Sequence, residues 1–179
     1  RMGTCGGLQP DIPTDGLIAS SHGLGLDNLL HYYPLEQTEE EKRVIEAFIA
    51  HTGVGERAIL PYLVRGNDTL LQGFISQGYF HGITVTCPGF YAPQGRMLRI
   101  PIAFKALPDK MTSFREAALR ITNFEMETSA IYGLGRLMGH RCLSINTVVA
   151  NRTTHQFSAD SKKAIANMIT RSLEVLTSL

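Results

Sequence analysis

Residues 121–150, ITNFEMETSAIYGLGRLMGHRCLSINTVVA, contain the pattern that decides the fold class. At Ile121–Phe124 we expect a short strand. A helix should follow and end at Gly139, since glycine favours the conformation that terminates helices. Arg141–Ala150 predicts a second, buried strand. This alternation indicates an α/β layered domain. The helix is supported by apolar residues at helical spacing, namely Met126, Ala130, Leu134, Leu137 and Met138.

Further helices are expected on both sides of this segment. Thr38 and Glu41 form a capping-box pattern, which predicts a helix that begins there and ends at Gly53. Asp68–Gln77 and Lys110–Leu119 are shorter helix candidates. The C-terminal stretch predicts an amphipathic helix through its apolar residues Ile165, Met168, Ile169, Leu173 and Leu176.

Two more strands are expected towards the N-terminus. Gly16–Ser21 predicts a short buried strand that leads into a glycine-rich loop through Gly25. Gly82–Cys87 is rich in β-branched residues and is closed by a Pro-Gly turn, which predicts another strand. No linker or repeat divides the chain, so we expect one domain over residues 1–179. Because the chain opens on Arg1 and runs directly into a glycine-rich motif, we also expect the natural protein to be longer at its N-terminus.

The composition argues against several classes of function. Apolar residues make up 44% and charged residues 18% of the 179 residues, as in an ordinary folded protein. The net charge of +1 gives no electrostatic basis for binding nucleic acid or an anionic membrane. No apolar run reaches the roughly 18–20 residues of a membrane helix, and the first residues do not resemble a signal peptide. We therefore expect a cytoplasmic protein with reduced cysteines. The histidines and cysteines show no metal-ligand spacing, so no metal or cofactor is expected.

The first motif that carries chemistry is Arg1-Met-Gly-Thr4-Cys5-Gly6-Gly7. A turn of glycines allows backbone N–H groups to converge on an anion, while Arg1 adds a fork of donors and Thr4 a hydroxyl. The motif is not a P-loop, because no GKS or GKT sequence follows. Taken alone, the motif is better explained by a tight structural turn than by an anion site.

The second motif is Phe90-Tyr91-Ala-Pro-Gln94-Gly-Arg96. Gln94 offers a donor and an acceptor, and Arg96 offers several donors, which suits the carbonyl–NH–carbonyl edge of a pyrimidine. Two residues apart in an extended segment, they would point to the same side. Phe90 would then pack on a ring or sugar face. A polar surface loop, with Phe90 in the core, is the competing interpretation.

The third and fourth motifs lie at strand ends. Glu125 and Glu127 in NFEMET would align on an extended segment, so we expect the next helix to start at or just after them. A carboxylate can accept hydrogen bonds from both ribose hydroxyls, although two glutamates also favour a helix N-terminus. Asn151 and Arg152 end the late strand, where ligands of α/β sheets bind. An ordinary solvated strand exit would explain them as well.

These motifs, in this order, resemble the nucleoside phosphorylases of the uridine phosphorylase type. RMGTCGGLQPDI resembles the phosphate motif of that family, and FYAPQGR its pyrimidine motif. NFEMET resembles its ribose motif, and VVANR its strand-end motif. The likeness covers the whole chain. It implies a three-layer α/β nucleoside-phosphorylase-like domain, with a mixed central sheet flanked by helices.

The resemblance also implies a role for each residue of the motifs. Five would be catalytic: Arg1, Thr4, Gln94, Arg96 and Glu127. The wider binding set would be Arg1, Thr4, Cys5, Gly6, Phe90, Gln94, Arg96, Glu125, Met126, Glu127, Val149, Ala150 and Arg152. Within it, Arg1 and Thr4 would bind phosphate, the Gly6 region would shape the turn, Gln94 and Arg96 would hold uracil, and Phe90 would lie beside base and sugar.

The remaining roles concern the sugar and the pocket wall. Glu127 would accept the ribose hydroxyls with Met126 beneath the sugar and Glu125 in support. Arg152 would order the Gln94/Arg96 pair, Val149 and Ala150 would line the base pocket, and residues 153–161 would form a mobile flap.

The expected reaction is phosphorolysis of uridine to uracil and ribose 1-phosphate, with inorganic phosphate as co-substrate and no cofactor. The family assembles as homodimers grouped into hexamers, which implies the same here. Two features depart from the family. Its early glycine loop and second phosphate-binding arginine are absent from this chain, and Cys5 stands where relatives often carry a small hydroxyl residue.

Two alternatives stay open. A purine nucleoside phosphorylase or nucleosidase would need an aspartate near the end of the late strand, where this chain has Val149-Ala150-Asn151-Arg152. A non-catalytic nucleoside-binding protein would need no phosphate, so the phosphate dependence of uridine turnover distinguishes it from an enzyme.

Overall fold

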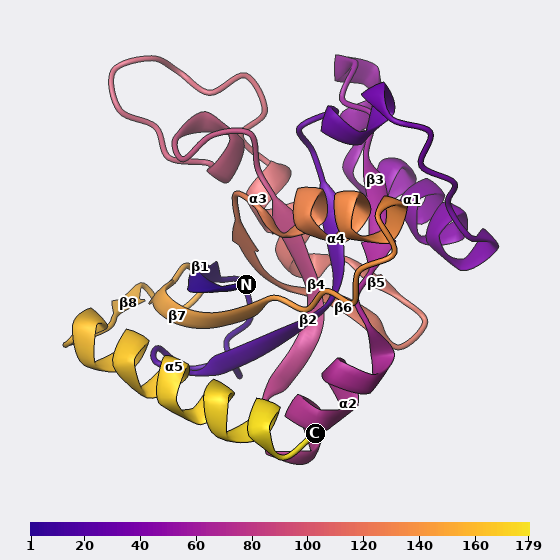
Figure 1. The fold of residues 1–179 in the computed structure, drawn as a ribbon. Helices are drawn as coiled ribbons and strands as arrows, with labels where there is room; N and C mark the ends of the chain where they lie inside the picture. Colours follow the sequence, from indigo (N-terminus) through magenta and orange to yellow (C-terminus); the bar gives the residue numbers. More distant parts are fainter.

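The computed structural model describes residues 1–179, which fold around one mixed sheet (Figure 1). Its strands are β1 (Met2–Gly7), β2 (Leu17–Gly25), β3 (Tyr62–Arg65), β4 (Phe80–Thr86), β5 (Arg115–Glu116), β6 (Leu119–Glu125), β7 (Ile145–Asn151) and β8 (Gln156–Phe157). They follow the order β3-β2-β4-β6-β1-β7-β8, with β5 paired to β6. The expected α/β class with a mixed sheet flanked by helices is confirmed.

The sheet also closes on itself. The first residues of β2, Leu17–Ala19, pair antiparallel with β7, while β2 as a whole pairs in parallel with β4. The strands β2, β4, β6, β1 and β7 therefore form a ring. Closure removes free edges from these strands and brings the ends of β6 and β7 next to β1.

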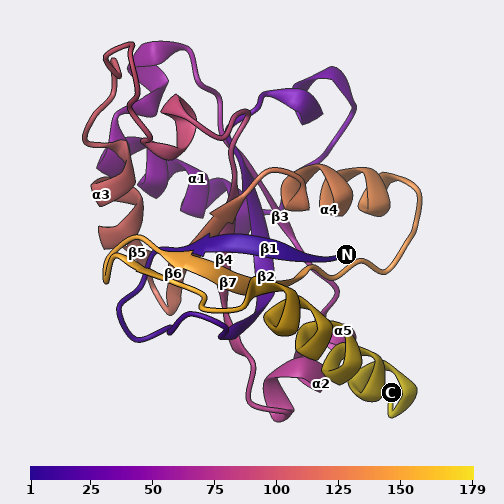
Figure 2. The same ribbon diagram turned by 90° about the vertical axis from the view of Figure 1, so that its left-hand side faces the viewer.

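Helices cover both sides of this sheet (Figures 1 and 2). They are α1 (Glu39–Thr52), α2 (Asp68–Ser76), α3 (Leu107–Ser113), α4 (Thr128–Leu137) and α5 (Ser161–Thr177). In both views α1, α3 and α4 lie towards the top of the picture, and α2 and α5 lie towards the bottom. α4 packs on β2, β3 and β4, whereas α5 packs on β1, β7 and α2. No helix is long and apolar enough to cross a membrane.

Local sequence signals set the ends of the best-predicted helices. Thr38 accepts a hydrogen bond from the Glu41 backbone N–H, and the Glu41 side chain accepts one from the Thr38 N–H, so the capping box is formed. Gly53 ends α1 in the left-handed conformation at φ 75°. Asn67 caps α2 by accepting a hydrogen bond from the Leu70 backbone N–H.

Some element boundaries differ from the sequence-based expectations. The strand expected at Gly16–Ser21 continues to Gly25, because its glycine-rich end pairs with both β3 and β4 instead of forming a loop. The strand expected over Arg141–Ala150 begins only at Ile145. The helix expected over Lys110–Leu119 is wrong beyond Ser113: α3 ends there, and β5 and β6 then form a hairpin.

The largest correction concerns the motif at Arg1–Gly7. It forms the central strand β1 between β6 and β7, not a turn. The glycines serve close packing: a Cβ on Gly6 would lie 2.5 Å from a ring carbon of Phe124. Because the partner strands lie far along the chain, no local pattern could reveal this pairing.

Candidate active site

A cavity of about 540 Å³ opens where β1, β6 and β7 meet the loop that carries Phe90 and Arg96. All the expected binding residues except Arg152 line it. It also contains Gly3, Phe124 and Phe157, which the sequence analysis did not single out. Phe124 stands inside the NFEMET motif and could have been suspected there. Phe157 lies in a polar loop with no pattern to mark it.

A β-bulge shapes the cavity wall. Cys5 pairs with Val148 and Gly6 with Ala150, so Val149 has no partner on β1. Such a bulge bends the strand and redirects side chains, and it is common beside active sites. Val149 and Ala150 both line the cavity at this point.

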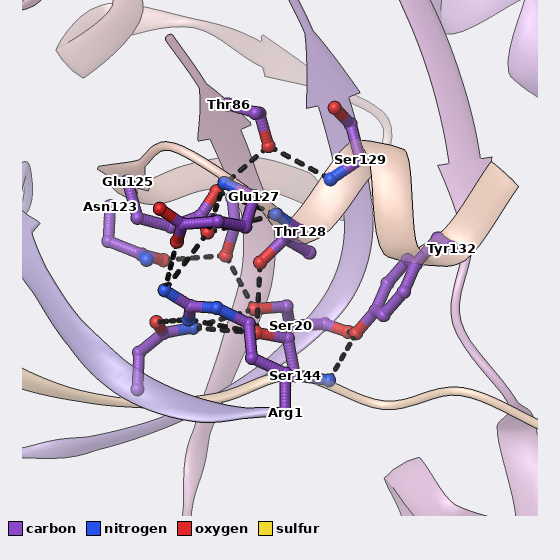
Figure 3. A network of polar contacts seen from close by, with 12 residues as sticks. Arg1, Ser20, Thr86, Asn123, Glu125, Glu127, Thr128, Ser129, Tyr132 and Ser144 are labelled. Atoms are coloured by element: carbon purple, nitrogen blue, oxygen red, sulfur yellow. Dashed lines mark hydrogen bonds and ion pairs between the residues drawn. The ribbon is translucent and has the colours of Figure 1, made fainter. Parts of the chain in front are cut away.

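Arg1 and two glutamates form a charged cluster in the cavity (Figure 3). Arg1 Nη2 lies 2.5 Å from Glu127 Oε2 and 3.3 Å from Glu125 Oε2. Glu125 is the last residue of β6, and α4 begins at Thr128, as the motif predicted. The two carboxylates thus reach one guanidinium, and the residue expected to bind phosphate is paired with the residue expected to bind ribose.

The two carboxylates differ in their surroundings. Glu125 is buried and accepts hydrogen bonds from Thr86 Oγ1 (2.8 Å) and from the backbone N–H groups of Glu127 and Thr128 (both 2.9 Å to Oε2). Burial raises the pKa of Glu125 above the ordinary glutamate value, and Arg1 and the backbone donors reduce that increase. The Glu127 side chain is 53% exposed. Glu127 is therefore the carboxylate that a ligand can reach.

Gln94 and Arg96 are in contact, but not because they lie on one side of an extended segment, as was expected. Residues Ala92–Gln94 form a 3-10 turn, and Gly95 is left-handed at φ 72°, so the segment is not extended. Arg96 Nη1 nevertheless donates to Gln94 Oε1 and to the Phe90 carbonyl oxygen, the latter at 2.7 Å. The guanidinium also stacks 3.8 Å from the Phe90 ring centre. Phe90 is 51% exposed, so the interpretation that placed it in the core is wrong.

Arg152 and Asn151 lie behind the cavity wall. Arg152 donates to the carbonyl oxygens of Gln94 and Gly95, both at 2.9 Å, which holds the turn that carries the Gln94 side chain. Asn151 is buried, and its Nδ2 donates to the carbonyl oxygens of Gln9 and Ile12. Asn151 therefore anchors the end of β7 and is not available to a ligand.

The remaining cavity residues complete its floor and rim. Thr4 is exposed at the cavity, and Met126 is 42% exposed there. Burial and the Glu125 carboxylate raise the pKa of the Cys5 thiol, so Cys5 is a neutral wall residue and not a nucleophile. The structure brings together no group of three or more His, Cys, Asp or Glu side chains that could hold a metal ion.

Residues 153–161, expected to be a flap, return along β7. Gln156 and Phe157 form β8, which pairs antiparallel with Ala150 and Asn151. Phe157 is 79% exposed and lines the cavity. The mobility of this hairpin stays a prediction.

Comparison with known proteins gives this cavity a context. The sequence profile of the phosphorylase superfamily matches residues 1–179. The chain belongs to the phosphorylase superfamily. It is 26% identical to a uridine phosphorylase of Thermococcus kodakarensis, over 98% of this chain and 56% of that protein. The chain thus spans little more than half the length of this curated relative.

Solved structures of the superfamily agree on the fold. A Trypanosoma brucei nucleoside phosphorylase, described as showing uridine phosphorylase activity, superposes with a TM-score of 0.90 at 26% identity, over 100% of this chain and 63% of that one. A uridine phosphorylase structure from Phytophthora capsici superposes with a TM-score of 0.61 at 19% identity, over 100% and 65% of the two chains. The second likeness, at this low identity, speaks for the fold alone.

Proposed function

We propose that the protein is an enzyme that cleaves uridine with inorganic phosphate, giving uracil and ribose 1-phosphate. The observation that carries the proposal is the composition of one cavity, in which Arg1, Glu127, Gln94 and Arg96 come together. These groups suit the phosphate, the ribose and the pyrimidine edge, respectively. The named activities of the similar proteins from Thermococcus kodakarensis and Trypanosoma brucei support it.

The reaction needs a positioned nucleophile and a stabilised leaving group. A phosphate oxygen attacks C1′ of the ribose while the bond from C1′ to the base nitrogen breaks, and its electron pair moves onto uracil. Phosphate is already anionic, so no protein base has to activate it. Catalysis then rests on positioning and electrostatics along an oxocarbenium-like path.

Each end of the substrate has a matching group. Arg1 and Thr4 hold phosphate below C1′, and Glu127 accepts the 2′- and 3′-hydroxyls with Met126 against the sugar. Because Arg1 is paired with Glu127 in the structure, phosphate has to compete for the guanidinium and thereby frees the carboxylate for ribose. Gln94 and Arg96 donate to the carbonyl oxygens of uracil as negative charge develops on them.

A pyrimidine is preferred over a purine because of the end of β7. A purine requires an acid that protonates the leaving base, and the wall here consists of Val149 and Ala150. The next residue, Asn151, is committed to backbone carbonyls of Gln9 and Ile12. Arg152 is likewise committed to the turn at Gln94.

The same proposal covers the domain, the cellular location and the assembly of the protein. Residues 1–179 form one nucleoside phosphorylase domain of a cytoplasmic protein that takes only small-molecule substrates and no cofactor. It assembles as a homodimer or as a trimer of dimers, with sites shared across the dimer. The mass of the full-length protein in solution tests the assembly.

The test is the turnover of uridine by the full-length protein with and without phosphate. Gln94→Ala should lower kcat/KM for uridine about 100-fold, as expected when a donor to the transition state is lost. The exposed Lys162→Ala serves as the control and should leave kcat/KM unchanged. Faster cleavage of inosine or adenosine would contradict the base assignment. Turnover that does not depend on phosphate would indicate a nucleosidase, and binding without turnover a non-catalytic protein.

A further inference from the structure

A line of polar side chains crosses the middle of the sheet beneath Arg1. It consists of Asn146 on β7, Ser20 on β2, Thr84 on β4 and Asn123 on β6, and all four are fully buried. Asn146 Nδ2 donates to Ser20 Oγ (3.1 Å), the Ser20 and Thr84 hydroxyls meet at 2.6 Å, and Thr84 Oγ1 donates to Asn123 Oδ1 (2.9 Å). Buried strands of this kind are ordinarily apolar, and polar groups there are tolerated only when they are hydrogen-bonded.

The hydrogen bonds along this line all run in one direction, and this fixes which end of the Asn146 amide faces Arg1. Thr84 gives its hydroxyl proton to Asn123, so the proton between Ser20 and Thr84 has to come from Ser20. Ser20 is then the acceptor for Asn146 Nδ2. The other end of the amide, the acceptor Oδ1, consequently faces Arg1, and it lies 2.5 Å from Arg1 Nη1.

Ser144 supports the same nitrogen of Arg1. Its Oγ lies 3.2 Å from Arg1 Nη1 and accepts a hydrogen bond from Thr128 Oγ1 at 2.9 Å. The Ser144 backbone N–H donates to the Tyr132 hydroxyl at 2.8 Å, which in turn donates to the Ser20 carbonyl oxygen. Hydrogen bonds with residues of β2 and α4 thus hold Asn146 and Ser144, the two acceptors of Arg1 Nη1, in place at β7.

We infer that Asn146 is a positioning residue that sets the direction of the Arg1 guanidinium towards phosphate. Asn146 and Ser144 are neutral acceptors, so they hold Nη1 without cancelling the positive charge that an anion needs. Nη2 remains directed to the cavity, where it meets Glu125 and Glu127. The inference rests on the proposed function, because it assumes that Arg1 binds phosphate.

Two substitutions of Asn146 in the full-length protein test this role. Asn146→Ala removes the acceptor and should raise both the KM and the Kd for inorganic phosphate about tenfold, as expected when a hydrogen bond to a charged group is lost. Asn146→Asp keeps an acceptor but adds a negative charge beside Arg1, so it should weaken phosphate binding more than alanine does. The KM for uridine should stay within about twofold, because no uridine-binding residue is changed.

The neighbouring residue Thr147 provides the matched control. It is equally buried on β7, its hydroxyl has no hydrogen-bond partner, and its side chain points to the other face of the strand. Thr147→Val should therefore leave the phosphate and uridine constants unchanged. An additional measurement uses the Arg1→Ala background, in which Asn146→Ala should have no further effect on phosphate binding.

The outcomes separate this inference from the proposed function. Phosphate binding measured by calorimetry needs no nucleoside, so a protein that binds phosphate but cleaves no nucleoside defeats the proposed function, while the Asn146 variants still test the positioning. An unchanged phosphate Kd in Asn146→Ala, an equal loss for uridine and phosphate, or a full effect in the Arg1→Ala background would each overturn the positioning role. So would a wild-type protein that binds no phosphate.

Discussion

Glu41 and Glu125 are two buried glutamates with similar neighbours, but their pKa values are shifted in opposite directions. Each lies in or just ahead of the first turn of a helix, faces an arginine and accepts hydrogen bonds from backbone N–H groups. Glu41 takes both Nη atoms of Arg136, at 2.5 and 2.9 Å, together with the N–H groups of Thr38 and Arg65. Arg1, by contrast, lies 3.3 Å from Glu125 and also contacts other acceptors.

The pKa values of the two glutamates shift in opposite directions because both Nη atoms of Arg136 bind Glu41, whereas Arg1 is shared between Glu125 and other acceptors. Burial alone would raise the pKa of Glu41, but Arg136 and the backbone donors outweigh it and hold that pKa below the ordinary value. At Glu125 burial prevails over Arg1, so the pKa is raised. Glu41, which binds both Nη atoms of its arginine, therefore stabilises the fold, whereas Arg1 is shared among several acceptors beside a cavity and stays within reach of a ligand.

The largest expected effect is on stability at Glu41. Glu41→Ala leaves Arg136 and two backbone N–H groups without their acceptor, which should lower the free energy of unfolding by about 3–5 kcal/mol. Denaturant unfolding measures this loss. Lys42→Ala is the control, because its pair with Glu39 is exposed and contributes at most about 1 kcal/mol. The kinetic constants of the folded fraction should not change; reduced turnover per folded molecule would show that Glu41 also serves the site.

A smaller effect, on activity, is expected at Glu127. Glu127→Gln weakens the charge-assisted bonds to ribose and should reduce kcat/KM for uridine by the equivalent of about 1.5–3 kcal/mol. The loss for 2′-deoxyuridine should be smaller, because one of the two hydroxyls is missing. Stability should hardly change, since the side chain is half exposed. Equal losses on both substrates would instead assign Glu127 a structural role at the start of α4.

The smallest effect is a difference in pH dependence. The pKa of Glu41 is lower in the folded than in the unfolded protein, so its stabilisation is present above the unfolded value of about 4.3 and is lost as the pH falls through the folded value. The pKa of Glu125 is raised, so its contribution is most favourable below about pH 4.3 and is lost as the pH rises through the folded value.

Unfolding of the wild type, Glu41→Gln and Glu125→Gln between about pH 3.5 and 7 tests this difference. The advantage of the wild type over Glu41→Gln should shrink towards acid. The stability of the wild type relative to Glu125→Gln should improve towards acid. Parallel curves for the two variants would refute the contrast between the two sites.

Some of this architecture was readable from short stretches of sequence. The capping box at Thr38 and the stop at Gly53 place α1 correctly, because both signals act within one helical turn. The position of Glu125 and Glu127 ahead of α4 was also predicted, because two carboxylates two residues apart align on an extended segment but point apart on a helix. The Lys110–Leu119 prediction failed because propensity could not foresee that residues 115–125 pair as a hairpin.

The sequence by itself determined the α/β class, the main helices and the order of motifs that points to the superfamily, since these depend on local conformation and on residue type. Only the tertiary structure decided that Arg1–Gly7 is a central strand and that β2 closes on β7. It also decided the partners of Arg1, because Asn146 and Ser144 are more than 140 positions away in the chain. The strength of a buried charge pair depends on which groups surround it in the protein interior. These groups are often distant in the sequence, so packing decides them rather than sequence neighbours.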